Sequence, residues 1–455
     1  MRLTALAAAA LALMSSVALA EAPHFEPRKS PGGIEFWYRA RPDLTKDTFA
    51  AGWRDGVGFA LPGKEGLSRV GGRMLWRAGT LHLFDDLFSA LRGIGAHANI
   101  YTNGSATFAT LVGSLRNFDA AAGLANNILA APLPGESDLE RIEDGLVKSV
   151  GDAEQNPELA LEWAARRLGQ PKAPGNAPYY NPAAYSTIAR EDVETWRRRV
   201  LARDNLTIAV EGPSSADELG RIFDRLAQPL PEKSDAVAAP EMAFSARPQT
   251  IVIESAREQT SILAITPTRI GRGPERLRFV VALQTLGGGA DSRLAAALRE
   301  KLGDAYETRA GLTDDRSNEL AFYGARVAND RAPEALAAMR AAFAAWRDNG
   351  ARAAEVEATA SRLKASFDER YFGDRYSEEE NAPRDFVEIV LAGQPANTGF
   401  DYAERLASFT ADNVNAAVRA KIPAGPWLTL IMAPSAAPFH ADCVIKSWRE
   451  VDKCR

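Results

Sequence analysis

Hydrophobic and polar positions alternate in two similar series along the chain, and the first series predicts a unit of strands followed by helices. Short runs of β-branched and aromatic residues, broken by Gly, Pro and Asp, are typical of strands. They predict strands at 34–38, 48–53, 56–60, 96–102, 106–112 and 206–210. Apolar residues at helical spacing predict helices at 84–91, 118–129, 139–150, from Pro157 onward and at 193–201.

The second series repeats this order. It predicts strands at 250–254, 260–266, 321–327 and 427–432, and helices at 333–347, 354–367 and 412–420. Residues 228–249 contain four prolines and many small residues, which is typical of a linker. The pattern therefore predicts an α+β chain with two similar domains, 21–227 and 250–435, joined by that linker and followed by a tail, 436–455.

The most distinctive segment of the second half is Leu286–Tyr306, where an apolar helical run leads into three consecutive glycines. Glycines permit a positive φ and close backbone approach, and Asp291 or Ser292 can cap a new helix. One buried stripe is expected on that helix, from Leu294, Ala297, Leu298 and Leu302. Gly303 is expected to end it in the left-handed conformation. A phosphate-binding loop is excluded because no Lys-Ser or Lys-Thr pair follows the glycines.

The first 20 residues are predicted to be a signal peptide. Arg2 is followed by an apolar run and by the small-residue cleavage site Ala18-Leu19-Ala20. The run is too short for a membrane span, which needs about 20 residues, so we expect an exported, most simply periplasmic, chain. Its formal net charge of −5 (54 minus 59) becomes −6 (53 minus 59) without Arg2. This mild acidity argues against nucleic acid as the main partner.

Two cysteines lie close together near the C-terminus, Cys443 and Cys454. In an oxidising compartment such a pair favours a disulfide that pins the tail. A metal pair is the weaker alternative because the CxxC spacing is absent.

Three parts of the glycine-rich segment together resemble a known signature. They are Gly-Gly-Gly-x-x-Ser-Arg-Leu, Arg299-Glu300-Lys301 and Gly303-x-Ala305-Tyr306. This text is similar to the signature in the C-terminal half of the pitrilysin/insulinase zinc-peptidase family. The resemblance implies two homologous halves in a clam-like arrangement, each a mainly antiparallel sheet covered by helices on one face.

Catalytic members of that family carry His-x-x-Glu-His in the first half. The matching text here is Gly66–Thr80, whose flanks agree while the functional positions do not. Arg69 and Arg73 stand where the histidines belong, and Gly72 stands where the general base belongs. Lys148-Ser149-Val150 occupies the expected place of a further carboxylate ligand. Because a guanidinium has no lone pair for a metal, we expect no zinc and no cofactor on this chain.

Other roles for the two arginines stay open. Arg69 and Arg73 lie one helical turn apart, so they could line a wet cavity or pair with Asp85 or Asp86. The four histidines do not offer a substitute site, because ligand clusters need three or four groups.

In two-subunit bacterial members of the family, the subunit without zinc supplies an Arg and a Tyr to the shared chamber. By resemblance these are Arg299 and Tyr306, which implies a non-catalytic, substrate-binding subunit of a heterodimeric zinc endopeptidase. A catalytic paralogue with an intact motif would then be the partner. The alternative is a stand-alone peptide-binding or scaffold protein, with Arg299 solvated at a helix end and Tyr306 packed in the following strand.

Overall fold

The computed structural model describes residues 24–455 except for twelve gaps. The gaps are 56–62, 65, 77–90, 104–105, 131, 171–181, 236–243, 269, 271–274, 304–306, 314–319 and 373–381. The predicted signal peptide, the predicted strand 56–60 and nearly all of the predicted helix 84–91 lie outside the described residues. No described helix combines the length and apolar character needed to cross a membrane.

The described strands form two six-stranded sheets. The first has the order β1-β2-β6-β3-β5-β4, built from Glu26–Lys29, Glu35–Ala40, Leu206–Gly212, Asp47–Arg54, Ala106–Gly113 and His97–Thr102. The second has the order β12-β7-β11-β8-β10-β9, built from Cys443–Ile445, Thr250–Glu254, Leu428–Ala433, Gln259–Pro267, Leu320–Ala328 and Glu307–Leu312. Most strands lie within a few residues of their predicted positions.

Five strands of each sheet share one topology. In both sheets the first pair of the five is parallel, β2 with β6 and β7 with β11, and the other three pairs are antiparallel. The sheets differ at one edge, where β1 runs antiparallel to β2 and β12 runs parallel to β7. The structure thus has the predicted α+β architecture of two similar halves.

The remaining elements are helical. The α-helices are α2 (Leu67–Trp76), α4 (Leu115–Ala130), α5 (Glu136–Glu154), α6 (Pro157–Gly169), α8 (Arg190–Val200), α9 (Ala216–Ala227), α10 (Arg276–Gly287), α11 (Arg293–Leu302), α12 (Ala332–Asn349), α13 (Ala353–Phe372), α14 (Ala382–Leu391), α15 (Tyr402–Ala407) and α16 (Ala411–Lys421). The 3₁₀ helices are η3 (Pro182–Thr187), η4 (Arg203–Asn205), η5 (Asn329–Arg331) and η6 (Trp448–Cys454).

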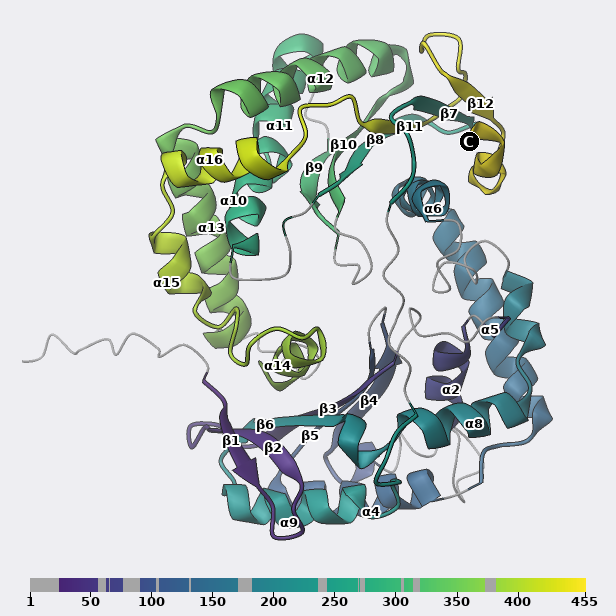
Figure 1. Cartoon of the computed structure of the whole chain (residues 1–455), viewed down its shortest axis with the longest axis vertical. Helices are drawn as coiled ribbons and strands as arrows, with labels where there is room; N and C mark the ends of the chain where they lie inside the picture. Colours follow the sequence, from purple (N-terminus) through teal and green to yellow (C-terminus); the bar gives the residue numbers. More distant parts are fainter. Residues whose placement is uncertain are drawn as a thin grey trace, which may run out of the picture.

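Each sheet packs one face against helices of its own half (Figure 1). On the first sheet, Phe118 of α4 and Phe223 of α9 both contact Phe49 of β3, with ring centroids 6.2 and 5.4 Å away. On the second, Phe343 of α12 stacks on Tyr323 of β10 at 5.0 Å. Burial of these large aromatic side chains provides much of the hydrophobic stabilisation of each half.

The two halves also exchange one helix each, which the sequence pattern did not predict. Helix α14 of the second half packs on β3 and β6 of the first sheet, and α6 of the first half packs on β8 and β11 of the second. Phe386 of α14 is fully buried against Phe25 and Trp37, with ring centroids 4.7 and 5.0 Å away. The second face of each sheet is therefore covered by the opposite half.

A buried carboxylate fixes helix α2 to the first sheet. Asp55, at the end of β3, accepts hydrogen bonds from Ser68 Oγ at 2.7 Å, Thr107 Oγ1 at 2.9 Å and Trp196 Nε1 at 2.8 Å. These donors come from α2, β5 and α8, so one side chain joins three elements. A buried charge needs such hydrogen bonds to be tolerated.

Trp196 also leaves no room at the neighbouring Gly71, and this generates a prediction. A Cβ at Gly71 would lie 2.3 Å from the Trp196 ring, so Gly71→Ala should lower the free energy of unfolding by about 1–3 kcal/mol. The measurement is urea denaturation followed by circular dichroism.

The matched control is Gly123→Ala, at an exposed position of helix α4 where a Cβ would meet no atom within 4 Å. Alanine is the better helix former there, so this variant should be stabilised by roughly 0.5–1 kcal/mol. Equal stability of the two variants would contradict the packing argument.

Candidate functional site

Helix α2 carries the three positions at which the family motif would place its metal ligands and base. Arg69 is half-buried and its Nη1 donates to Tyr185 Oη at 3.3 Å, while Tyr185 itself is fully buried in η3. Arg73 is exposed, and its guanidinium lies next to Gly145 of α5, 3.9 Å from where a Cβ of residue 145 would be. The suggested partners Asp85 and Asp86 lie outside the described residues.

Gly72, at the position of the general base, is buried against β4. A Cβ there would lie 3.0 Å from Thr102 Oγ1, which is itself bonded to the Ser68 carbonyl at 3.2 Å and lies 3.0 Å from Thr107 Oγ1. Helix α2 therefore sits so close to the sheet that a larger side chain at position 72 would have to displace a bonded hydroxyl.

These positions do not fit a catalytic zinc ion. A guanidinium offers five donors and no lone pair, and glycine offers no side chain. Within the described ranges, no three His, Cys, Asp or Glu side chains lie close enough together to hold a metal.

A buried acid on α5 escaped the sequence analysis. Glu143 is only 7% exposed, and its Oε1 has no hydrogen-bond partner in the described part of the chain. Burial raises the pKa of Glu143 to about 7, and the nearby charges of Asp144 and Glu136 add to the rise. Its position gave a signal, because it falls on the buried stripe of α5 with Leu139, Ile142, Leu146 and Val150.

The glycine-rich segment forms the predicted helix–turn–helix. Helix α10 ends at Gly287, and Gly289 adopts a φ of 108° in the turn. Ser292 caps α11 by accepting a hydrogen bond from the Ala295 amide at 3.4 Å. Gly303 ends α11 in the left-handed conformation with a φ of 77°. The local predictions for this turn and both ends of α11 are confirmed.

Another residue of the signature, Arg293, forms a contact that the sequence did not reveal. Its guanidinium bonds to Glu355 of α13, with Nη2–Oε2 at 2.7 Å and Nε–Oε1 at 3.1 Å. Burial opposes ionisation of Glu355, but hydrogen bonds from Arg293 and Arg352 outweigh it and lower the pKa to about 2. This ion pair fixes the start of α11 against α13.

Of the predicted pair Arg299 and Tyr306, the described part of the chain contains only Arg299. Arg299 is exposed in the last turn of α11, and its Nη2 donates to the Ala290 carbonyl in the glycine-rich turn. Tyr306 lies outside the described residues. Their suggested role in substrate binding stays a prediction.

A cavity of about 520 Å³ lies between the two halves. The first half lines it with Asn103, Ala106 and Phe108, and the second half lines it with side chains of α10, α13, α14 and α15. Asn103 Nδ2 donates to Glu388 Oε1 of α14 at 3.2 Å across the boundary. The wall of this cavity thus combines polar and apolar side chains, as ligand pockets commonly do.

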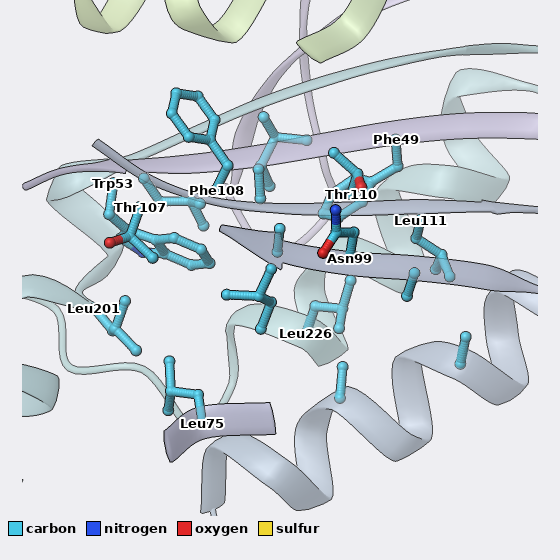
Figure 2. Close-up of a pocket in the computed structure, with 18 of the residues that line it drawn as sticks. Phe49, Trp53, Leu75, Asn99, Thr107, Phe108, Thr110, Leu111, Leu201 and Leu226 are labelled. Atoms are coloured by element: carbon cyan, nitrogen blue, oxygen red, sulfur yellow. The ribbon is translucent and has the colours of Figure 1, made fainter. Parts of the chain in front are cut away.

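A second cavity, of about 120 Å³, lies inside the first half, between its sheet and helices α4 and α9 (Figure 2). Phe49, Trp53, Leu75, Leu111 and Leu226 are among the side chains that surround it. Its surface is almost entirely apolar, so it lacks the charged groups that acid–base chemistry would need.

Glu143 generates a prediction about pH. Its pKa is raised in the folded state, so the unfolded chain ionises first, and the free energy of unfolding should fall between about pH 4.5 and pH 7 and then level off. Glu143→Gln should remove this component and be more stable than the parent chain at pH 8 by about 1–3 kcal/mol. Denaturation at several pH values measures it.

The control for this experiment is Asp152→Asn, an exposed acid on the same helix whose charge is not among those that raise the pKa of Glu143. It should leave the pH profile nearly unchanged. A Glu143→Gln profile that runs parallel to the parent profile would show that Glu143 is not responsible.

Comparison with known proteins identifies part of the chain and its fold. Residues 187–363 match the family model described as the peptidase M16 inactive domain. A search of curated proteins found no match. Three bacterial crystal structures illustrate the structural similarity.

The first is a peptidase M16 inactive domain from Pseudomonas fluorescens, with a TM-score of 0.77 and 18% identity over 91% of this chain and 99% of that one. A putative M16-like peptidase from Alicyclobacillus acidocaldarius has a TM-score of 0.73 and 15% identity over 90% and 99%. A protease from Helicobacter pylori has a TM-score of 0.74 and 13% identity over 90% and 100%.

The matched segment includes the glycine-rich signature, and the structural similarity extends over both halves. Residues 187–363 are thus similar to the inactive domain of M16 peptidases, and the chain as a whole has the M16-like fold.

Proposed function

We propose that this chain is the non-catalytic, peptide-binding subunit of an exported heterodimeric zinc endopeptidase. A catalytic paralogue with an intact His-x-x-Glu-His motif supplies the zinc and the general base. The observation that carries the proposal is the structure around α2, in which the fold is complete but the ligand and base positions hold Arg69, Gly72 and Arg73. The match to an inactive-type M16 domain supports the same conclusion.

The anchoring of α2 explains why the fold does not need the metal. Asp55, Ser68 and Trp196 hold the helix in place, and none of them is a motif position. A chain with this arrangement keeps the fold of a peptidase but has no zinc ligands or general base at the motif positions. A subunit that binds substrate without cleaving it requires this combination.

Two strands provide surfaces for an extended peptide. In the described sheets β4 and β9 each lie at an edge, and each is paired on one side only, with β5 and β10. An edge strand presents backbone N–H and C=O groups to which a peptide can add as a further strand. Helix α2 packs on β4, so a peptide on this edge would lie beside the vacated motif.

Arg299 is suited to contact such a peptide. It is exposed at the end of α11, and one of its nitrogens already bonds to Ala290. A guanidinium has five N–H donors, so others remain for substrate carbonyl or carboxylate groups. Tyr306 follows closely in the sequence and is proposed to add a phenolic donor to the same site.

A second candidate function follows from the pairing of the two halves within one chain. Helices α6 and α14 already cover the sheets reciprocally, so the fold does not depend on another subunit. This observation favours the alternative of a stand-alone peptide-binding or scaffold protein with no catalysis.

The experiment that separates the two functions is native mass spectrometry of the tagged chain isolated gently from its own cells. A one-to-one complex with a paralogue that carries His-x-x-Glu-His and one zinc ion is expected. Free monomer or homodimer in every preparation would contradict the heterodimer and leave the stand-alone function. Zinc bound stoichiometrically to the isolated chain would contradict both.

Arg299 generates a prediction for the isolated complex. Arg299→Ala should lower peptide turnover by about 100-fold, since loss of one transition-state donor costs about 2.7–4 kcal/mol. The complex should stay intact in native mass spectrometry because Arg299 is exposed and bonds within its own half. Steady-state kinetics with a quenched fluorescent peptide measures the effect.

Lys301→Ala is the control, because Lys301 is an exposed cation in the same last turn of α11. Its turnover should stay within about fivefold of the parent, as expected for an exposed charge worth at most ~1 kcal/mol. Equal losses in both variants would indicate a general charge effect and would refute a specific role for Arg299.

A further inference from the structure

We propose that the C-terminal segment Cys443–Arg455 is a clasp that holds the two halves together and that its disulfide is the lock. This segment, the C-terminal clasp, contains β12 and η6. The proposal rests on contacts between the halves and does not depend on the proposed peptidase function.

Both ends of the C-terminal clasp are attached to the second half. Strand β12 pairs with β7, with Cys443 opposite Ile251 and Ile445 opposite Ile253. The backbone carbonyl of Cys454 accepts a hydrogen bond from Gln249 Nε2 at 3.0 Å. Lys446 forms an ion pair with Glu254 at the end of β7. The segment is therefore built into the edge of the second sheet.

Between these ends, helix η6 of the C-terminal clasp contacts the first half. Trp448 is buried and packs edge-on against Trp163 of α6 at 5.5 Å, and its Nε1 donates to Glu154 of α5 at 3.0 Å. Two ion pairs accompany it, Arg449 with Glu154 at 2.7 Å and Asp452 with Arg167 of α6 at 2.5 Å. Helix η6 thus contacts two helices of the opposite half.

The disulfide joins these two ends. Cys443 lies on β12 and Cys454 is the last residue of η6, 11 positions further on. Besides this covalent bond, η6 is joined to the second sheet by the chain itself, by the hydrogen bond from Gln249 and by Val451, which is fully buried in the same apolar cluster as Ile251 and Ile253. Cross-linking a segment this short reduces the conformational freedom that η6 must lose in order to contact α5 and α6.

The position of the C-terminal clasp determines what its release would do. Other contacts also join the halves. Helix α6 packs directly on β8 and β11, and Arg309 of β9 forms an ion pair with Glu158 of α6 at 2.9 Å. Helix α14 packs on the first sheet, where Asn397 also bonds both backbone groups of Phe25, at 2.8 and 3.1 Å. In Figure 1, α14 lies left of the centre, and the clasp lies at the upper right near α6. Loss of the clasp would therefore remove one of the contacts that hold α6 against the second sheet and loosen that side, while α14 would stay in place.

The chemical step is reduction by a dithiol. The S–S bond accepts two electrons and two protons to give the Cys443 and Cys454 thiols, and the reductant becomes a disulfide. Ion pairs at the protein surface are individually weak, with a median of about 0–1 kcal/mol. After reduction, the packing of Trp448 against Trp163 therefore remains as the main contact between the clasp and the first half.

Hydrogen exchange with mass spectrometry on the folded full chain tests the proposal. After reduction with dithiothreitol, amides of α6 and η6 should exchange about tenfold faster, as expected for local opening. Those of β3 and β10 should not change. Unchanged exchange in α6 would overturn the proposal. Equal acceleration in β3 and β10 would also overturn it, because the disulfide would then stabilise the whole fold.

Two variants complete the test. The double variant Cys443→Ser with Cys454→Ser should show fast exchange in α6 with or without dithiothreitol, so a response to reductant there would contradict the lock. Trp448→Ala keeps the disulfide but removes the contact with Trp163, and it should show fast exchange in α6 without reductant. If the serine variant does not fold, reduction of the folded parent chain still decides between the outcomes.

Discussion

Burial of both faces of two β-sheets is the constraint on which this structure depends. Each half supplies helices for one face of its own sheet, as α4 and α9 do for the first sheet. The second face is covered by a helix of the opposite half, α14 or α6. An uncovered apolar sheet face would leave residues such as Phe108 and Phe386 in water, so each half needs the other. The cavity between the halves is a consequence of this exchange, because its walls come from both.

The residues that hold helix α2 in place are different from the residues at its motif positions. Asp55 joins α2, β5 and α8 through residues that face the sheet and α8, whereas Arg69 and Arg73 project elsewhere from the same helix. Substitution at the motif positions therefore leaves the helix anchored. For this reason a fold associated with peptidases persists here around a site that cannot hold zinc through those side chains.

The sequence predicted the features that depend on neighbouring residues. Ser292 caps α11 and Gly303 ends it because both effects act within one helical turn. The exchange of α6 and α14 was not predictable, since periodicity shows that a helix has a buried face but not which sheet covers it. The same limit applies to Arg293, whose partner Glu355 lies 62 positions away. Glu143 differs, because it falls on the apolar stripe of α5 and the sequence therefore carried a signal of its burial.

Two arginines on α11, Arg293 and Arg299, show that residue type alone does not indicate the role of a side chain. Arg293 and Arg299 lie on one helix, yet Arg293 is half-buried in an ion pair with α13, whereas Arg299 is exposed and bonds to the Ala290 carbonyl in the nearby turn. The ion pair of Arg293, together with the Ser292 cap, fixes the start of the helix. The long cationic side chain of Arg299 remains exposed at the other end of the helix. A binding group is most effective when its backbone is held rigidly. The structural role of Arg293 is therefore what would make a binding role for Arg299 effective.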